Sequence, residues 1–535
     1  MTTKLKNLIL TFLTIACLTP SYAWKTDANK DDADDFSTLN VVFIGNSITE
    51  GVGVENPATQ APPAVAAAQL ARQQGISDVR FFNAGMRGAR TTDFLPGARL
   101  LNRALAGADS LARLGGAMVF SIMLGTNDSA IYPGPTPRTE PEEFKSNIMA
   151  TIDALRHRYP GATVVIHRPV WYSENALNGA TYMLDGARIL QRYATVLADI
   201  ARENVGRNIY LGDTLAYDHF RENHRLEMVA EQGRAGIFYL HPNRQGSAKL
   251  GEYWARGIMK AINAASGRVD AFLKINSGYN GSRPRVDALT FPGSVSPELT
   301  YNAAFPHGGV LENPYLAFRV YFDNRQSIDL YAKKHPEAEL DLTNFYILPS
   351  DTTGQYGRDV LWAGASIAAG SFRGWQNGSP ATIDTVATRT QRVEWPDRLI
   401  VEDNGWQYNG HTISVRQTYT VSALSPDLEV DIELSGHTPD DVFCTGVQKL
   451  ATGNQGFADP RGVAASCGSN IPDASRPDAT VSVGLAVTVD PANVVGATTD
   501  EINYLILLRP DRHGRIRYHI SAASPLPTDW LERFR

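Results

Sequence analysis

The pattern of hydrophobic residues changes near residue 266, and this change limits the folds open to the chain. From residue 40 to about residue 265, apolar runs typical of strands alternate with longer stretches typical of helices. Strands separated by helices predict βαβ units and a parallel sheet covered on both faces. The expected strands are 39–44, 79–83, 117–124, 162–167 and 208–211, and the expected helices are 61–74, 140–159, 187–204 and 246–265.

Strand patterns dominate the remainder of the chain. Residues 266–287 are rich in Gly, Ser, Asn and Arg, which is typical of a linker. From residue 288 to residue 535 convincing helical patterns are few, and we expect an antiparallel β-sandwich. Its expected strands are 315–322, 327–332, 398–402, 411–421, 428–434, 479–489 and 501–508. The predicted domains are therefore 38–265 and 288–535.

The first residues have the pattern of a secretory signal peptide. Lys4 and Lys6 precede an apolar run over residues 8–18, which is too short to span a bilayer. Small residues then stand at the cleavage site in Ser21-Tyr22-Ala23. We expect a signal peptide over residues 1–23 and a secreted or periplasmic protein, with a first helix of the core as the alternative.

The predicted cleavage decides which cysteines the mature chain keeps. It removes Cys17, which offers a less favoured lipoprotein alternative because the residues before it match a lipid-attachment site poorly. Residues 24–37 then form an acidic, flexible lead-in. Cys444 and Cys467 remain, and they either pair in the oxidising compartment or stay separate thiols. They lack the histidine spacing of a zinc site, so no metal is expected.

Composition excludes some classes of partner. A net charge of −6 favours neither nucleic acid nor an anionic membrane surface. The 43% of hydrophobic residues is ordinary for a globular protein with ample core. No run after the signal reaches the roughly 18 apolar residues that a transmembrane helix needs.

A serine follows the first expected strand directly. The apolar run 41–44 leads into Gly45-Asn46-Ser47, a turn that lifts a hydroxyl from the carboxyl edge of a sheet. Such a serine is a nucleophile only with a base and an oxyanion hole nearby. Taken alone, Ser47 could simply cap the next helix.

Three further blocks follow at the ends of strands or before the last helix. They are Asn83-Ala-Gly85-Met-Arg-Gly88, Leu124-Gly125-Thr126-Asn127-Asp128 and His241-Pro242-Asn243. Each has a plain structural alternative: a turn for Asn127-Asp128, and a helix entrance for His241-Pro242. Only a shared site explains why all of them fall where one edge of the sheet is expected.

In this order, the serine, glycine, asparagine and histidine blocks of residues 38–265 resemble the SGNH (GDSL) hydrolase superfamily. The resemblance implies a three-layer αβα, flavodoxin-like domain without a cofactor. It implies that Ser47 attacks an ester carbonyl and that His241 is its general base. The oxyanion would be held by the N–H groups of Ser47 and Gly88 and by the Asn127 amide. Supporting positions are Asn46, Gly85, which shapes its turn, and Asp128.

The chain departs from the family pattern at two positions. Asn46 replaces the usual Asp before the serine, a mild change because that position acts mainly by hydrogen bonding. The Asp that usually stands three residues before the histidine is replaced by Phe238, which cannot orient an imidazole. A backbone carbonyl could orient His241 instead, or the domain could be catalytically weak. A carboxylate from upstream could also serve, with Asp213, Asp218, Glu227 and Glu231 as candidates.

Other side chains near the same edge are candidates for contacting a substrate. Aromatic faces suit sugar rings and arginine suits a carboxylate such as a uronic acid. The candidates are Arg87, Arg90, Arg168 and Trp171, with a packed loop as the alternative for Arg168 and Trp171.

The second half resembles an uncharacterised β-rich domain family found in bacterial polysaccharide-degradation systems. The resemblance rests on stretches such as 308–322, 362–370 and 404–411. Aromatic residues here could form a sugar platform, although filling a sandwich core is favoured. These residues are Trp362, Trp375, Trp395, Trp406 and Tyr408.

Together these features predict a secreted serine esterase that removes acetyl groups from a polysaccharide or oligosaccharide. The alternatives are a lipase or thioesterase of the same fold, a glycan-binding protein with a degenerate esterase domain, and a glycoside hydrolase or lyase in the second half.

Overall fold

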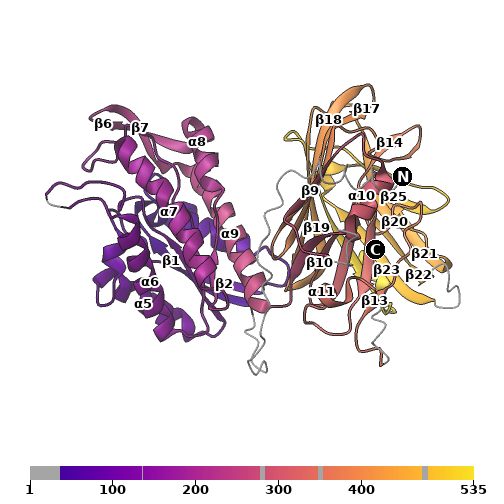
Figure 1. Ribbon diagram of the computed structural model, residues 1–535, viewed down its shortest axis with the longest axis horizontal. Coiled ribbons are helices and arrows are strands. Elements are labelled where there is room, and N and C mark those ends of the chain that lie inside the picture. The colour runs from indigo at the N-terminus through magenta and orange to yellow at the C-terminus, as the bar shows by residue number, and fades with distance from the viewer. Residues whose placement is uncertain (1–35, 135, 277–282, 347–352, 473–479) are drawn as a thin grey trace, which may run out of the picture. The chain divides into compact units, whose positions relative to one another are not determined.

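The computed structural model describes residues 36–134, 136–276, 283–346, 353–472 and 480–535. These residues form two compact units, the first ending at Ser266 and the second starting at Gly267 (Figure 1). The predicted signal peptide and nearly all of the acidic lead-in lie outside the described residues. Within the described parts of the chain, no helix is both long and apolar enough to cross a membrane.

A five-stranded parallel sheet forms the centre of the first unit, in the order β2-β1-β3-β4-β5. Its strands are β1 (Thr38–Gly45), β2 (Asp78–Asn83), β3 (Ala117–Met123), β4 (Thr163–Ile166) and β5 (Ile209–Leu211). The long helices are α4 (Pro62–Leu70), α5 (Arg99–Ala112), α6 (Pro141–Arg158), α7 (Met183–Glu203), α8 (Ala216–Glu227) and α9 (Arg244–Ser266).

Both faces of this sheet are covered, as the continuous apolar run of β1 predicts. On one face Phe43 stacks on Trp254 of α9, with ring centroids 5.8 Å apart. On the other face Val42 and Ile44 join a core built with residues of α5, α6 and α7. The predicted α/β domain with a parallel sheet is confirmed.

Two features of the first unit are absent from the sequence prediction. Helix α5 was not predicted, although Leu100, Ala104 and Ala108 repeat at the spacing of a buried helical face. No helix or strand was predicted between residues 211 and 246. This segment contains α8 and an antiparallel hairpin of β6 (Met228–Gly233) and β7 (Gly236–Pro242).

The second unit is built almost entirely from antiparallel sheets, as predicted. Two sheets have five strands, in the orders β13-β12-β11-β10-β8 and β15-β14-β20-β25-β24. The third has nine, in the order β21-β22-β23-β26-β19-β18-β17-β16-β9. One hydrophobic cluster takes side chains from all three sheets, among them Phe318, Val415 and Ile506.

The strands of the second unit agree with most predicted positions and add several. Those in the first five-stranded sheet are β8 (Asp270–Ile275), β10 (Ala304–Glu312), β11 (Leu316–Tyr321), β12 (Ile328–Ala332) and β13 (Arg358–Asp359). Those in the second are β14 (Arg373–Gln376), β15 (Ser379–Ala381), β20 (Phe443–Gln448), β24 (Val494–Thr499) and β25 (Asn503–Leu508).

The nine-stranded sheet consists of β9 (Ala288–Pro292), β16 (Thr388–Glu394), β17 (Arg398–Tyr408), β18 (His411–Ser422), β19 (Ser425–Ser435), β21 (Thr452–Asp459), β22 (Val463–Asn470), β23 (Val481–Val489) and β26 (Arg515–Ala523). Strand β8 falls inside the segment predicted to be a linker and pairs with β10. Short helices α10 (Pro297–Ala303) and α11 (Leu340–Thr343) complete the unit.

The cysteines and aromatic residues of the second unit are mostly structural. Cys444 and Cys467 are both free thiols, so the structure holds no disulfide between them. Burial raises the pKa of the Cys444 thiol. Trp406 and Tyr408 are buried side by side, with ring centroids 4.4 Å apart. They fill the core, whereas Trp362 and Trp395 are exposed and Trp375 is partly buried.

Candidate active site

Ser47 lies at the tight connection between β1 and the short helix α2 (Ser47–Glu50). Asn46 caps this helix, because its Oδ1 accepts a hydrogen bond of 3.0 Å from the Ile48 N–H. Ser47 is therefore not the cap, and its hydroxyl is free for another partner. Gly45 must lack a side chain, since a Cβ there would meet Thr49 Oγ1 at 2.0 Å and the Met123 carbonyl at 2.9 Å.

A chain of hydrogen bonds runs from Ser47 through His241 to Glu231. Ser47 Oγ lies 2.9 Å from His241 Nε2, and His241 Nδ1 lies 2.8 Å from Glu231 Oε1. With Nδ1–H donating to the carboxylate, the Nε2 lone pair faces the serine hydroxyl. His241 is 9% exposed, so the pair is largely shielded from water. The arrangement is that of a nucleophile, its base and an orienting acid.

The hairpin β6–β7 carries both Glu231 and His241. Its register shifts between Met228 and Ala230, and Glu231 then pairs with Phe238. Phe238 itself is 1% exposed and belongs to the hydrophobic core. Phe238, at the position where the family usually has the acid, therefore packs in the core. The neighbouring strand β6 provides the Glu231 carboxylate that contacts the His241 imidazole.

The other three upstream carboxylates have different partners. Asp213 accepts N–H bonds at the start of α8, from Leu215 at 3.0 Å. Asp218 pairs with Arg168 at 3.4 Å, and Glu227 lies 2.6 Å from His219 Nε2. Glu231 alone among the four candidates contacts His241.

Gly88 and Asn127 come together at the carboxyl edge of the sheet. Gly88 has φ of +78°, a left-handed conformation that favours glycine. Asn127 Nδ2 donates a 2.9 Å hydrogen bond to the carbonyl of Ala89, the residue after Gly88. One N–H of this amide remains for a ligand. The two predicted oxyanion donors are therefore adjacent.

Gly85 joins the turn that carries Gly88 to the turn that carries Ser47. Its N–H donates to Asn83 Oδ1 at 2.9 Å, and Asn83 Nδ2 donates to the Thr49 carbonyl at 2.8 Å. A Cβ on Gly85 would lie 2.4 Å from the Glu50 nitrogen, so only glycine allows this approach.

Tyr182 is a site residue that the sequence did not indicate. It is 3% exposed, and its hydroxyl donates a 2.8 Å hydrogen bond to Asn127 Oδ1. Burial raises the pKa of Tyr182, which keeps the phenol protonated and able to donate. Because Oδ1 is held in this way, Asn127 must present its NH₂ group to the other side.

Asp128 forms hydrogen bonds with Thr91 and not with His241. It is fully buried and accepts hydrogen bonds from the Thr91 N–H at 3.0 Å and from Thr91 Oγ1 at 2.5 Å. Burial raises the pKa of this carboxyl, and the Thr91 donors oppose that shift. Its contacts hold the Asn127 turn against the start of the 3₁₀ helix Thr91–Phe94, which follows the Gly88 turn.

The candidate substrate-binding residues differ in their contacts with the rest of the protein and in their exposure. Arg90 donates to Pro137 O and Thr139 Oγ1, both at 2.8 Å. Arg168 pairs with Asp218 and lies 3.9 Å over the Tyr217 ring. Arg87 is the most exposed of the three arginines, with 71% of its side chain accessible and a 3.4 Å pair to Glu50.

Trp171, the fourth candidate, begins a row of partly exposed rings. Its ring centroid lies 5.0 Å from that of His224, which lies 4.8 Å from that of Tyr239. Tyr239 stands two residues before His241 on β7, so both side chains extend from the same face of the strand. The row therefore ends on the strand that carries His241.

His167, which also follows a strand of the sheet, has a structural role. Its Nε2 lies 3.0 Å from Ser121 Oγ, and its Nδ1 accepts the Asp213 N–H at 3.0 Å. Burial lowers the pKa of His167 to about 3, so the imidazole stays neutral.

The parallel sheet and the four blocks at its edge place the first unit in the SGNH class of α/β folds. Residues 43–249 match the model of the GDSL-like lipase/acylhydrolase family. Residues 279–529 match a family described as a domain of unknown function (DUF4861). None of the curated proteins matches the chain.

Several solved structures are similar to this chain. A carbohydrate acetylesterase from Sinorhizobium meliloti is 19% identical, with 41% of this chain and 98% of that chain covered and a TM-score of 0.29. An acetylxylan esterase from Geobacillus stearothermophilus is 20% identical, with 42% and 93% covered and a TM-score of 0.28. A lipase/acylhydrolase from Enterococcus faecalis is 17% identical, with 41% and 95% covered and a TM-score of 0.27.

Proposed function

We propose that the first unit is a serine ester hydrolase that removes O-acetyl groups from a carbohydrate. The observation that carries this proposal is the hydrogen-bonded chain Ser47–His241–Glu231 beside the adjacent donors Gly88 and Asn127. A nucleophile, a base and an oxyanion hole at one point are what acyl transfer requires.

The reaction would proceed in two half-reactions. Ser47 Oγ attacks the ester carbonyl while His241 Nε2 takes its proton, and Glu231 stabilises the imidazolium that forms. The N–H groups of Ser47 and Gly88 and the Asn127 amide bind the tetrahedral oxyanion. His241 then protonates the leaving sugar hydroxyl, and an acyl group remains on Ser47. Water, activated by the same histidine, releases the acid and restores the serine.

The carbohydrate part of the proposal rests on different features. The rings of Trp171, His224 and Tyr239 form a row that leads from the strand of His241, and ring faces of this kind suit sugars. The N-terminal export pattern fits a protein that meets polysaccharide outside the cytoplasm. The second unit resembles a domain family found with polysaccharide degradation.

The test compares acetyl with long-chain esters. The purified chain should release acetate from acetylated xylan and from p-nitrophenyl acetate, and Ser47→Ala should lower kcat by about 10⁴-fold or more. Long-chain p-nitrophenyl esters should be poor substrates. Rapid hydrolysis of long-chain esters without acetate release from the polymer would favour a lipase instead. No hydrolysis of any ester would reject the proposal.

A further inference from the structure

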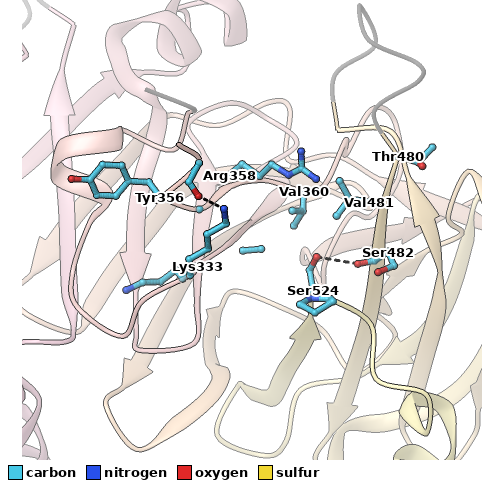
Figure 2. Close-up of a pocket in the computed structure, with 13 residues that line it drawn as sticks. Lys333, Tyr356, Arg358, Val360, Thr480, Val481, Ser482 and Ser524 are labelled. Carbon is cyan, nitrogen blue, oxygen red and sulfur yellow. Dashed lines mark hydrogen bonds between the residues drawn. The ribbon is translucent and has the colours of Figure 1, made fainter. Parts of the chain in front are cut away.

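A cavity of about 630 Å³ in the second unit concentrates positive charge. Figure 2 shows residues in and next to β12 and β13 on one side and residues around the start of β23 with Ser524 on the other. Among the described residues that line it there is no Asp or Glu. Its lining includes the polar side chains of Lys333, Lys334, Arg358, Thr480, Ser482 and Ser524.

Arg358 provides the main uncompensated charge. It pairs with Ala332 in the β12–β13 ladder, next to Asp359. Neighbouring strand residues point to opposite faces, and Asp359 accepts a 3.2 Å hydrogen bond from the buried Arg319 on its side. Arg358 is exposed on the cavity side (Figure 2). Its guanidinium makes no hydrogen bond or ion pair to another described residue.

The two lysines contribute unequally. Lys333 Nζ lies 2.9 Å from Glu312 Oε2, and the two side chains are 1% and 0% exposed, so this charge is balanced internally. Lys334 is exposed and donates to the Gly354 carbonyl, which does not neutralise its charge. The exposed cations of the lining are therefore Arg358 and Lys334. Behind the lining, the buried Glu339 carboxylate accepts the Gly357 N–H at 3.0 Å.

The opposite wall is neutral and rich in hydroxyl groups. Ser482 holds Ser524 through a 3.0 Å hydrogen bond from Ser524 Oγ to the Ser482 carbonyl. Thr480 is exposed, and the partly exposed Val481 adds apolar surface. Charge on one wall with hydroxyl and apolar groups on the other suits a ligand that is both anionic and polyhydroxylated.

We propose that this cavity binds an anionic sugar unit, with its carboxylate or sulfate group on Arg358 and its ring against the hydroxyl-bearing wall. Guanidinium groups bind both of these oxyanions through paired N–H donors. The choice of a carbohydrate rests on the proposed function, whereas the anionic character rests on the cavity alone. Because the whole chain carries a net charge of −6, a local positive site would be needed to hold a polyanion.

The test measures binding by the full chain with sugars that carry no ester. Isothermal titration is run with trigalacturonate, a sulfated oligosaccharide and neutral xylotriose. We expect binding of an anionic sugar that weakens at least about tenfold in Arg358→Gln, with a smaller loss in Lys334→Gln. The affinity should also fall as salt is raised. Whichever anionic sugar binds more tightly identifies carboxylate or sulfate as the natural group.

Arg512→Gln is the matched control, because Arg512 is an exposed arginine of the same unit that does not line the cavity. It should bind like the parent. Equal losses in Arg358→Gln and Arg512→Gln would show only non-specific attraction. Unchanged binding by Arg358→Gln, binding of xylotriose as tight as that of the anionic sugars, or no binding of either anion would each overturn the inference.

Hydrolysis is measured separately on p-nitrophenyl acetate. A chain that hydrolyses this ester but binds no anionic sugar overturns the binding inference alone. A chain that binds the anionic sugar without hydrolysing esters overturns only the proposed function.

Discussion

The two units use carboxylates in opposite ways. In the first unit Glu231 is a quarter exposed and holds a histidine that itself contacts a serine. In the second unit Asp403 is fully buried and lies 2.7 Å from Arg389, which is also buried. The first carboxylate is partly exposed and holds a histidine beside a serine, whereas the second belongs to an ion pair inside the core. Removing each partner should therefore affect activity in one unit and folding in the other.

The largest effect is expected at Glu231. Glu231→Gln removes the charge that stabilises the imidazolium, so kcat on p-nitrophenyl acetate should fall by about 10²–10⁴-fold. The thermal midpoint should change little, because the Glu231 side chain is partly exposed. Glu227→Gln is the control, since Glu227 also pairs with a histidine, His219, at 2.6 Å. If the two variants lose activity equally, Glu231 is not the orienting acid.

The corresponding change in the second unit should act on stability. Arg389→Met leaves the Asp403 carboxylate buried without its cation, which costs about 3–5 kcal/mol in comparable cases. Esterase activity below the unfolding temperature should be retained. Arg515→Met breaks a partly exposed pair with Glu433 and should leave the midpoint almost unchanged. Similar midpoints for both variants in chemical denaturation would contradict this account.

Tyr182 should show a smaller effect that is confined to the rate. Tyr182→Phe removes the donor to Asn127 Oδ1, so kcat should fall about tenfold with little change in KM. Combining it with Asn127→Ala should add little to the loss from Asn127→Ala alone. Tyr172→Phe is the control, because this buried phenol packs on Tyr182 but bonds Ser129 at 2.8 Å. Full additivity would contradict a positioning role for Tyr182.

The sequence could predict those parts of the site that depend on local motifs. Ser47, Gly88 and Asn127 follow strands of a parallel sheet, and their local motifs suffice to bring them to one edge. Glu231 could be named only as one of four candidates, because its contact with His241 depends on the register of the β6–β7 hairpin. Tyr182 could not be predicted as a site residue, because a tyrosine just before a helix usually only packs in a hydrophobic core.

In the second unit, likewise, the sequence could predict only the strands with a clear local pattern. Strands with clear alternation were predicted closely, β18 to within one residue at each end and β19 to within three. Strands β20 to β22 were missed, because Gly, Asn and Ser interrupt their apolar residues. Their pairing within the sheets, rather than their local sequence, makes them strands.

A separate effect concerns the acid stability of the first unit. The pKa of His167 is lowered to about 3 by burial, so the unfolded chain binds a proton that the folded chain does not. Its contribution is complete above pH 6.5 and is lost as pH falls towards 3, at roughly 1.4 kcal/mol per pH unit. His167→Asn should flatten the dependence of the first unit's unfolding free energy on pH between 6.5 and 4. An unchanged slope would show that His167 is not responsible.

The central claim is that Ser47 is an activated nucleophile whose base is His241. The most direct measurement is mass spectrometry after treatment of the intact chain with a fluorophosphonate, which labels activated serines covalently. The account predicts a single adduct on the peptide that contains Ser47, with labelling strongly slowed in His241→Ala. No adduct on Ser47, or labelling that is as fast without His241, would contradict it.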